Sequence, residues 1–292
     1  PSPTPTASPT PLPTATATAT ATLTPTATVT PSPTPTATPT ATPVPLHAQV
    51  TLNNSQVAQG HTAILHVKTN RPVSLRGTIA EEQQLIFTSS DGLDHVALIG
   101  IHALATLGAK PVRIVIDSDD GQQLAFDTEL YVVAGTYPTE RLEFTPAVAK
   151  LLDPQIADPE NERMAEVFTS STGEARWQGL FDWPLKGPIT SEFGTRRLYQ
   201  DTINGYHAGL DIDGEEGDVI QAAASGVVVM AEQLQVRGNV VVIDHGAGVM
   251  SGYFHMSEID VHVGQQVTKG ETLGKVGATG LVTGSHLHWD MH

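Results

Sequence analysis

The stretch S-H-L-H-W-D at residues 285–290, close to the C-terminus, alternates in polarity and predicts a β-strand. Side chains two residues apart on a strand point to the same face, so His286 and His288 are expected to project from one side of a sheet. Two imidazoles on one face suit a divalent metal with a proton-transfer group beside it. We therefore expect this strand to carry part of a metal site.

A second group of polar residues lies upstream, in the stretch Y-H-A-G-L-D at residues 206–211. His207 and Asp211 are four residues apart, and Gly209 between them permits a turn that directs both side chains to one point. A catalytic zinc site needs three protein ligands and one open position. His207, Asp211 and one histidine of the 286/288 pair would supply the ligands, and the other histidine would lie beside the metal as a general base.

Two further features of the composition bear on this site. The chain has no cysteine, which excludes disulfides and thiolate ligands, so histidines and carboxylates must hold any metal. His255 ends an apolar run that predicts a strand, and from there it would face the cleft and stabilise an oxyanion. Zinc lowers the pKa of a bound water to about 7, and a neutral imidazole with a pKa of about 6.5 can then take its proton.

The charge of the chain excludes one class of partner. The 292 residues include 15 Lys and Arg against 31 Asp and Glu, which gives a formal charge of −16. Nucleic acids need a clustered basic surface, so we expect no nucleic-acid partner, and we interpret the acidic surface as favouring solubility. No apolar run approaches the roughly 20 residues of a membrane span. The chain begins at Pro1 rather than methionine, so we expect an upstream segment, with a signal or an anchor as alternatives.

Residues 1–46 differ in composition from the rest. Up to Pro45 they are Pro, Thr, Ala and Ser with a few Leu and Val, and none is charged. Proline fixes φ and removes a backbone donor, so this tract predicts an extended, polyproline-II-like spacer. O-glycosylated stalks and unmodified linkers share this composition. In either case we expect a disordered Thr/Pro-rich stalk or linker.

Residues 47–135 predict a β-sandwich of the immunoglobulin-like kind. Short alternating apolar runs, at 63–67, 73–77 and 112–116, are separated by Asn, Asp, Gly and Pro turn residues. The histidines of this region lack the spacing of metal ligands and are interpreted as ordinary surface or core residues. They are His61, His66, His95 and His102.

Residues 136–179 predict a helical connector. Thr145-Pro146 and Asp158-Pro159 each combine an N-cap residue with a proline at the first helical position, which predicts two short helices. Such a connector would pack against both neighbours, or it would be a loose linker.

Residues 180–292 predict an antiparallel β domain. Glycines are dense, and strands are predicted at 226–231, 239–244 and 252–255, with turn-and-strand units at 264–267 and 270–274. No helix of normal length is visible here. We expect one large antiparallel sheet folded over a smaller one, in a chain that is mainly β.

The order of motifs in this last region is specific. The stretches are W-P (183–184), I-T-S-E-F-G-T-R (189–196), H-A-G-L-D (207–211), A-A-S-G-V-V (223–228), G-N-V-V-V-I-D-H-G (238–246), Y-F-H-M-S (253–257), V-G-Q-Q-V (263–267), G-A-T-G (277–280) and T-G-S-H-L-H (283–288). Together they resemble the lysostaphin/LytM-type zinc metallopeptidases, which cut peptidoglycan peptides. The resemblance covers somewhat more than the last third of the chain and says nothing of the stalk or the sandwich.

The resemblance implies a role for five residues. His207, Asp211 and His288 match the ligands of one Zn²⁺, and His286 and His255 match two non-ligand histidines that activate water and stabilise the tetrahedral intermediate. It further implies a peptidoglycan peptide as substrate and an extracytoplasmic location, secreted or attached to the cell envelope. We expect a monomer.

Three other histidines stay outside the predicted site. His245 falls at a structural turn of the pattern, and His262 and His292 match no functional position. The family's sheet normally continues past the His-x-His strand, whereas this chain stops at His292. We therefore expect a truncated C-terminal end and a domain weakened at that edge.

Three functions remain open from the sequence. The first is a zinc endopeptidase that hydrolyses peptide cross-links of bacterial peptidoglycan, and the five filled functional positions favour it. The second is an inactive wall-binding regulator that activates other wall hydrolases. The third is a carrier module, for which Lys269 and Lys275 lie in the wrong place. Glycyl-glycine bridges and D-alanyl links would both suit the scaffold as the bond cleaved.

Overall fold

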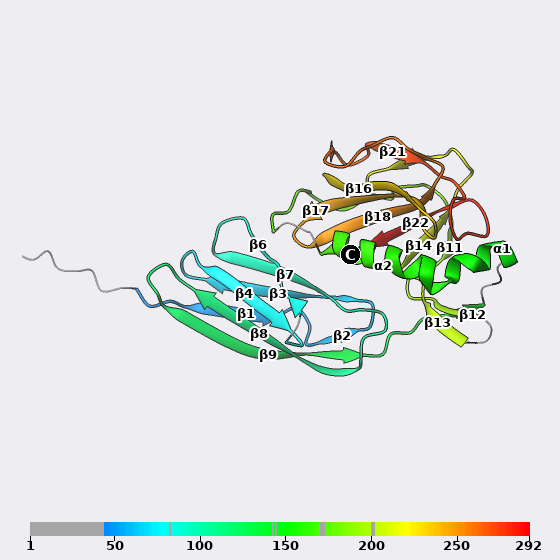
Figure 1. The fold of residues 1–292 in the computed structure, drawn as a ribbon. Coiled ribbons are helices and arrows are strands. Elements are labelled where there is room, and N and C mark those ends of the chain that lie inside the picture. The colour runs from blue at the N-terminus through cyan, green and yellow to red at the C-terminus, as the bar shows by residue number, and fades with distance from the viewer. Residues whose placement is uncertain (1–43, 82, 142, 144, 170–172, 200–201) are drawn as a thin grey trace, which may run out of the picture. The chain divides into compact units, whose positions relative to one another are not determined.

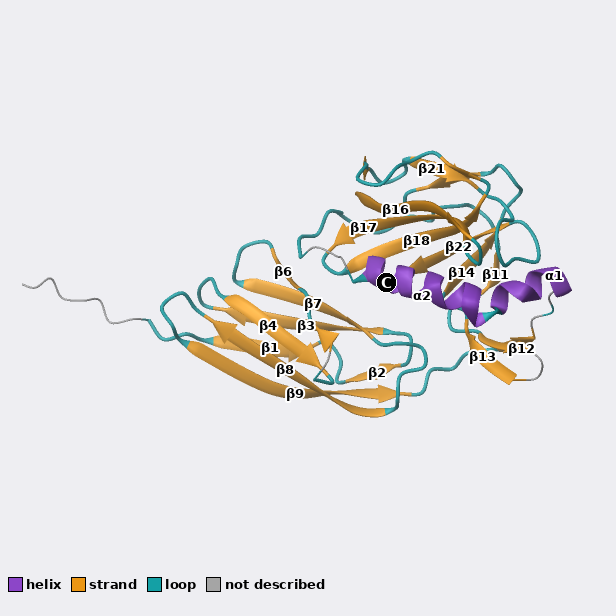
Figure 2. Cartoon of the chain, viewed as in Figure 1, coloured by secondary structure: helices purple, strands orange, loops and turns teal. Residues whose placement is uncertain are grey.

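The computed structural model describes residues 44–292 except 82, 142, 144, 170–172 and 200–201. The chain divides into two units, residues 1–43 and residues 44–292. The predicted stalk therefore lies outside the described residues up to residue 43, whereas Leu46 is buried in a hydrophobic core. The described part is built mostly of β-strands (Figures 1 and 2), which confirms the predicted mainly β fold.

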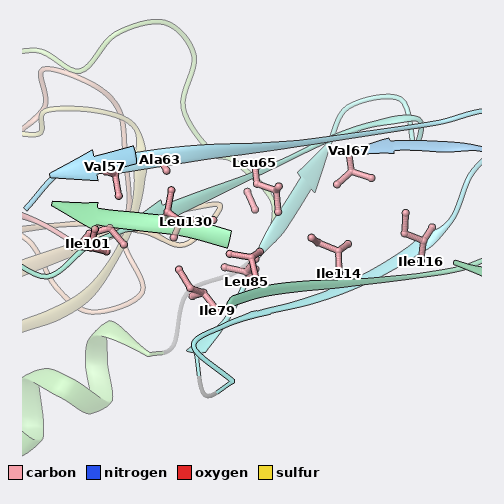
Figure 3. Close-up of a cluster of buried hydrophobic side chains, with 14 of the residues drawn as sticks. Val57, Ala63, Leu65, Val67, Ile79, Leu85, Ile101, Ile114, Ile116 and Leu130 are labelled. Atoms are coloured by element: carbon pink, nitrogen blue, oxygen red, sulfur yellow. The ribbon is translucent and has the colours of Figure 1, made fainter. Parts of the chain in front are cut away.

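Two sheets form the first part of this unit. Their strands are β1 (Ala48–Leu52), β2 (Gln56–Ala58), β3 (Thr62–Thr69), β4 (Ser74–Ile79), β5 (Gln83–Gln84), β6 (Phe87–Ser89), β7 (Asp94–Gly100), β8 (Gly108–Asp117) and β9 (Gln123–Val133). The sheet orders are β1-β3-β7-β6 and β2-β9-β8-β4-β5. Leu65, Ile114 and Leu130, which are fully buried, lie in the cluster of apolar side chains that both sheets contribute (Figure 3). This arrangement is a β-sandwich, because the alternating pattern gives each sheet one apolar face.

The segment after the sandwich contains a short strand and helical turns. They are β10 (Thr139–Arg141), α1 (Pro146–Ala149), the 3₁₀ turn η1 (Lys150–Leu152) and α2 (Pro154–Phe168). The predicted start of the second helix at Asp158-Pro159 is wrong. Asp153 caps α2, its side chain accepting from the backbone N–H of Gln155 at 2.9 Å, and Pro159 lies inside the helix. Asp153-Pro154 gives the same signal five residues earlier, and the helix tolerates the single backbone donor that Pro159 removes.

Three sheets make up the rest of the unit. The strands are β11 (Ile189–Ser191), β12 (Arg196–Tyr199), β13 (Thr202–Tyr206), β14 (Gly209–Asp213), β15 (Val219–Gln221), β16 (Gly226–Leu234), β17 (Gly238–Gly246), β18 (Val249–Met256), β19 (Glu258–Ile259), β20 (Gln266–Val267), β21 (Thr272–Lys275) and β22 (His286–Met291). The orders are β11-β14-β22-β18-β17-β16-β20, β15-β21-β19 and β10-β12-β13. The His-x-His strand β22 is thus an interior strand, paired on one side with β14 and on the other with β18.

Helix α2 packs on the seven-stranded sheet (Figure 1). Met164 and Val167 of the helix share a buried cluster with side chains of β16, β17 and β18, among them Met230 and Phe254. The helix therefore covers one face of the sheet that carries β22. Among the described residues, no helix is both long and apolar enough to cross a membrane.

Candidate metal centre

The pairing of β14 with β22 places the two predicted halves of the site opposite each other. Asp211 is the register partner of His288, and Gly209 is the partner of Asp290. Gly209 is the first residue of β14 and pairs with β22, so the predicted turn at this residue is wrong. A Cβ at position 209 would lie 2.4 Å from the carbonyl oxygen of Trp289. The glycine is needed because the two strands approach closely here.

Three donor atoms converge at this point. Asp211 Oδ1 lies 2.9 Å from His207 Nε2 and 2.9 Å from His288 Nδ1. The two imidazole nitrogens are 2.8 Å apart. His207 is fully buried, whereas the Asp211 and His288 side chains are 14% and 15% exposed. His207, Asp211 and His288 therefore form one group that could hold a metal ion, with its donor atoms all within 4.8 Å of one another.

The chemistry of these donors fits a divalent cation. His207 Nδ1 lies 3.2 Å from the carbonyl oxygen of Glu192, which can only accept, so Nδ1 carries the hydrogen and Nε2 presents a lone pair. That lone pair faces a carboxylate oxygen and a second imidazole nitrogen, an arrangement that a cation stabilises. Tetrahedral zinc with bonds of about 2.1 Å holds its ligands about 3.4 Å apart. The three donors would need to separate by only about half an ångström.

Burial and neighbouring groups set the protonation of two of the ligands. Burial alone would raise the pKa of the Asp211 carboxyl, but contacts with the imidazoles of His207 and His288 outweigh it and hold that pKa well below its usual range. Burial lowers the pKa of His207. Both groups are therefore in the form that binds a metal at neutral pH, an ionised carboxylate and a neutral imidazole.

His286 and His255 lie beside the three ligands. His286 Nδ1 is 2.9 Å from the carbonyl oxygen of Gly284, and its Nε2 is 3.6 Å from Asp211 Oδ1. His255 Nδ1 is 2.8 Å from the carbonyl oxygen of Thr279. Both Nδ1 atoms must donate to these carbonyls, so each neutral ring keeps a lone pair on Nε2. The centroids of the two rings are 5.1 Å apart.

The tautomer of His255 bears on its predicted role. Burial, and then the nearby His288 and His286, lower its pKa to about 3, so the ring is neutral at neutral pH. A neutral ring whose Nδ1 donates to Thr279 has no N–H left on Nε2. His255 would therefore donate a hydrogen bond to an oxyanion only after taking up a proton.

A cleft of about 800 Å³ opens in front of these residues. Asp211, His255, His286 and His288 line it, whereas His207 lies behind its wall. The other lining residues are Glu140, Leu152, Thr190, Ser191, Arg197, Gly205, Tyr206, Asp213 and the loop 281–285. Glu140 and Leu152 belong to β10 and η1, so the predicted connector forms part of the wall of the cleft.

Four polar residues near the ligands were missed from the sequence. Ser191 contacts His207, and Arg197 contacts Asp211. Glu140 contacts both Ser191 and Arg197. The carboxylate of Asp290 lies 3.9 Å from His288 Nε2. Arg196 and Arg197 are neighbours, and recognising the strand β12 at this point would have placed one arginine on each face. Nothing in the sequence pattern indicated Glu140.

The low pKa of His255 predicts a pH-dependent stability. In the unfolded chain His255 is protonated below about pH 6.5, whereas in the folded protein it stays neutral down to about pH 3. Between these two pH values the unfolded chain binds more protons, so the free energy of unfolding falls as the pH falls. The slope is at most about 1.4 kcal/mol per pH unit. His255→Gln should lose the His255 part of this slope, as measured by urea denaturation of the metal-free protein at several pH values, whereas His207 and His245, whose pKa burial also lowers, should keep their parts. His262→Gln is the control, and parallel curves for both variants would contradict the prediction.

The C-terminal part of the chain is similar to known proteins. The family model described as peptidase family M23 matches residues 205–292. The chain is 34% identical to the peptidoglycan DD-endopeptidase ShyA of Vibrio cholerae, over 48% of this chain and 30% of that protein. It is 35% identical to the murein hydrolase activator EnvC of Escherichia coli, over 41% of this chain and 27% of that protein. The chain thus spans less than a third of the length of either relative.

A solved structure matches over a longer part of the chain. The crystal structure of a peptidase M23 from Pseudomonas aeruginosa superposes with a TM-score of 0.57 at 26% identity, and the match covers 80% of this chain and 87% of that one. The five candidate site residues and six of the seven strands of the sheet that carries them lie within the part matched by the family model. The strand β11 and five cleft residues precede that part; the residues are Glu140, Leu152, Thr190, Ser191 and Arg197. Residues 205–292 of this chain form a domain of peptidase family M23.

Proposed function

We propose that this protein is a zinc-dependent endopeptidase that hydrolyses peptide cross-links of bacterial peptidoglycan. The observation that carries the proposal is the convergence of His207, Asp211 and His288 in an open cleft, with two further histidines beside them. One Zn²⁺ held by these three residues would supply Lewis-acid chemistry, polarising a carbonyl and acidifying a water. Cross-links of the cell wall as substrate, and an extracytoplasmic location, are supported by the relative that is a peptidoglycan DD-endopeptidase.

We assign the proton transfers to the two histidines that are not ligands. The hydrogen bond to Gly284 holds the His286 ring with its Nε2 lone pair toward the Asp211 carboxylate, where it can take a proton from an attacking water. His255 is assigned to the side of the scissile carbonyl. Its Nε2 would take up a proton from solvent through the open cleft as negative charge develops there and would then donate to the oxyanion, while the proton that His286 took from the water would pass to the departing amine.

An activator of other wall hydrolases is the second candidate. One relative is a murein hydrolase activator, so the same domain also occurs in a protein described by that role. The two candidate functions differ in whether they require a complete set of metal ligands. An activator does not need a complete donor set, whereas all three donors and both neighbouring histidines are present here.

Digestion of purified peptidoglycan separates the two candidates. We expect the zinc-loaded protein to release cross-link fragments that mass spectrometry resolves, and we expect a chelator to abolish the release. The masses would also identify the bond cleaved, glycyl-glycine or D-alanyl. Stimulation of a separate amidase by zinc-loaded protein that itself releases no fragment would overturn the proposal in favour of the activator.

A further inference from the structure

The strand β10 adds a carboxylate to the metal centre from outside the matched domain. It pairs in parallel with β12, and Glu140 is the register partner of Arg197. The family model begins at residue 205, so Glu140 lies far upstream of it. Glu140 nevertheless lines the same cleft as Asp211, His286 and His288.

Glu140 reaches two of the three ligands, each through one intermediate side chain. Its Oε2 accepts a hydrogen bond from Ser191 Oγ at 3.2 Å, and Ser191 Oγ lies 3.1 Å from His207 Nδ1. Its Oε1 lies 3.6 Å from Arg197 Nε, and Arg197 Nη2 lies 3.5 Å from Asp211 Oδ2. The Glu140 carboxylate is thus connected to His207 through Ser191 and to Asp211 through Arg197.

Arg197 is a potential competitor of a metal at Asp211. A guanidinium pairs with a carboxylate through two parallel hydrogen bonds when nothing prevents it. Here the Arg197 guanidinium approaches only Asp211 Oδ2 and leaves Oδ1 to the imidazoles. Within the part of the chain that the structure describes, Arg197 Nε has no hydrogen-bond partner, and Glu140 Oε1 attracts it as an ion pair.

We propose that Glu140 is a positioning residue of the metal centre, which draws the Arg197 guanidinium away from Asp211 and fixes His207 through Ser191. The inference rests on the proposed metal-dependent function. Residues that orient the ligands of a metal typically change its affinity by about 10- to 100-fold when they are replaced. Because the Glu140 and Arg197 side chains are 33% and 29% exposed, we expect an effect near the lower end.

The test is a zinc affinity measurement on the full chain, by competition with a chromophoric chelator and without substrate. We expect Glu140→Gln to weaken zinc binding about tenfold. Asp213→Asn is the matched control, because it removes one negative charge from the same cleft, two residues after Asp211 on β14. It should change the affinity by less than about threefold. Equal losses in both variants would reduce the role of Glu140 to its charge and overturn the inference.

A double variant tests whether Arg197 transmits the effect. Glu140→Gln/Arg197→Gln should recover zinc affinity to within about threefold of the unmodified protein, because no competing cation remains. Arg197→Gln alone should bind zinc at least as tightly as the unmodified protein. Circular dichroism would reveal whether Glu140→Gln unfolds. If it does, the zinc affinity of Arg197→Gln alone tests the inference. Additive losses in the double variant, or weaker binding by Arg197→Gln, would overturn the inference.

These outcomes separate the inference from the proposed function. If the unmodified protein binds zinc and Glu140→Gln binds it equally well, only the role of Glu140 fails. If the zinc-loaded protein shows the expected order of affinities but releases no peptidoglycan fragment, only the proposed hydrolysis fails. If the unmodified protein binds no zinc, both fail.

Discussion

His288→Ala is expected to lose zinc binding and peptidoglycan hydrolysis together. In the unmodified protein His288 Nδ1 supplies one of the three donor atoms. The Asp211 carboxylate and the His207 imidazole that remain in the variant cannot complete a three-ligand site. A catalytic metal contributes several kcal/mol of transition-state stabilisation. Since about 1.4 kcal/mol corresponds to a factor of ten, the rate of fragment release should fall at least about a thousandfold.

The measurement combines a zinc titration with the mass-resolved digest. His262→Ala is the matched control, since His262 is an exposed histidine of the same domain that lines no part of the cleft described here. It should retain both zinc binding and hydrolysis. Hydrolysis by His288→Ala at a rate near that of the control would rule out the assigned ligand set.

Glu160→Ala is expected to produce the largest loss of stability. Glu160 belongs to α2, yet its buried carboxylate accepts hydrogen bonds from three successive backbone N–H groups of the β16–β17 turn. The donors are Gln235, Val236 at 2.9 Å and Arg237 at 3.3 Å. The Arg237 guanidinium lies 3.5 Å from the same carboxylate. Alanine would leave these groups without their charged partner.

The magnitude follows from the burial. The Glu160 side chain is only 9% exposed, and breaking a buried charge pair by removing one partner typically costs about 3–5 kcal/mol. We expect about 3 kcal/mol, because the turn can partly hydrate once the helix loosens. For a unit of this size that lowers the melting temperature by about 6–12 °C. Thermal unfolding followed by circular dichroism is the measurement.

The control for this prediction lies on the same helix. Glu162→Ala removes an exposed carboxylate and should change the melting temperature by no more than about 2 °C. Equal melting temperatures for Glu160→Ala and Glu162→Ala would mean that α2 is not held by the turn.

The turn that Glu160 binds is also connected to the cleft. The carbonyl oxygen of Arg237 accepts from the backbone N–H of His255 at 3.1 Å, and that of Val236 accepts from Leu281 at 2.7 Å. His255 has a left-handed φ of 62°, which is costly for a residue with a Cβ and needs support from its surroundings. Helix α2, which lies outside the matched family domain, therefore stabilises the backbone on which His255 is placed.

Much of the site could be predicted from the sequence, because the alternating pattern of a strand depends only on residues close together in the chain. The alternation in 285–290 correctly predicted a strand, now β22, and both His286 and His288 line the cleft. His207 and Asp211 were found because a metal needs donors of that kind at close spacing. Three strands of the β-sandwich were indicated in the same way, by apolar runs at 63–67, 73–77 and 112–116 that are shorter than the observed strands β3, β4 and β8.

Other features depend on contacts between residues far apart in the chain. The register that sets Asp211 against His288, 77 residues away, has no local signal, and it gave Gly209 its role as a point of close strand approach instead of the predicted turn. The start of α2 was predicted at Asp158 instead of Asp153 because two Asp-Pro pairs carry the same local signal. Nothing in the sequence distinguished Glu140 and Glu160 from other carboxylates, since a hydrogen bond that a carboxylate accepts from a distant hydroxyl or backbone amide leaves no periodic pattern in the sequence.

The sequence by itself therefore determined the residue types of the site, the strands that carry His255, His286 and His288, and the mainly β fold. Only the tertiary structure decided which donors meet, which tautomers His255 and His286 adopt, and how β10 and α2 support the site from outside the family domain. The physical reason is that strand and helix patterns specify which face a side chain occupies. The neighbour across that face is set by strand pairing and packing over the whole unit.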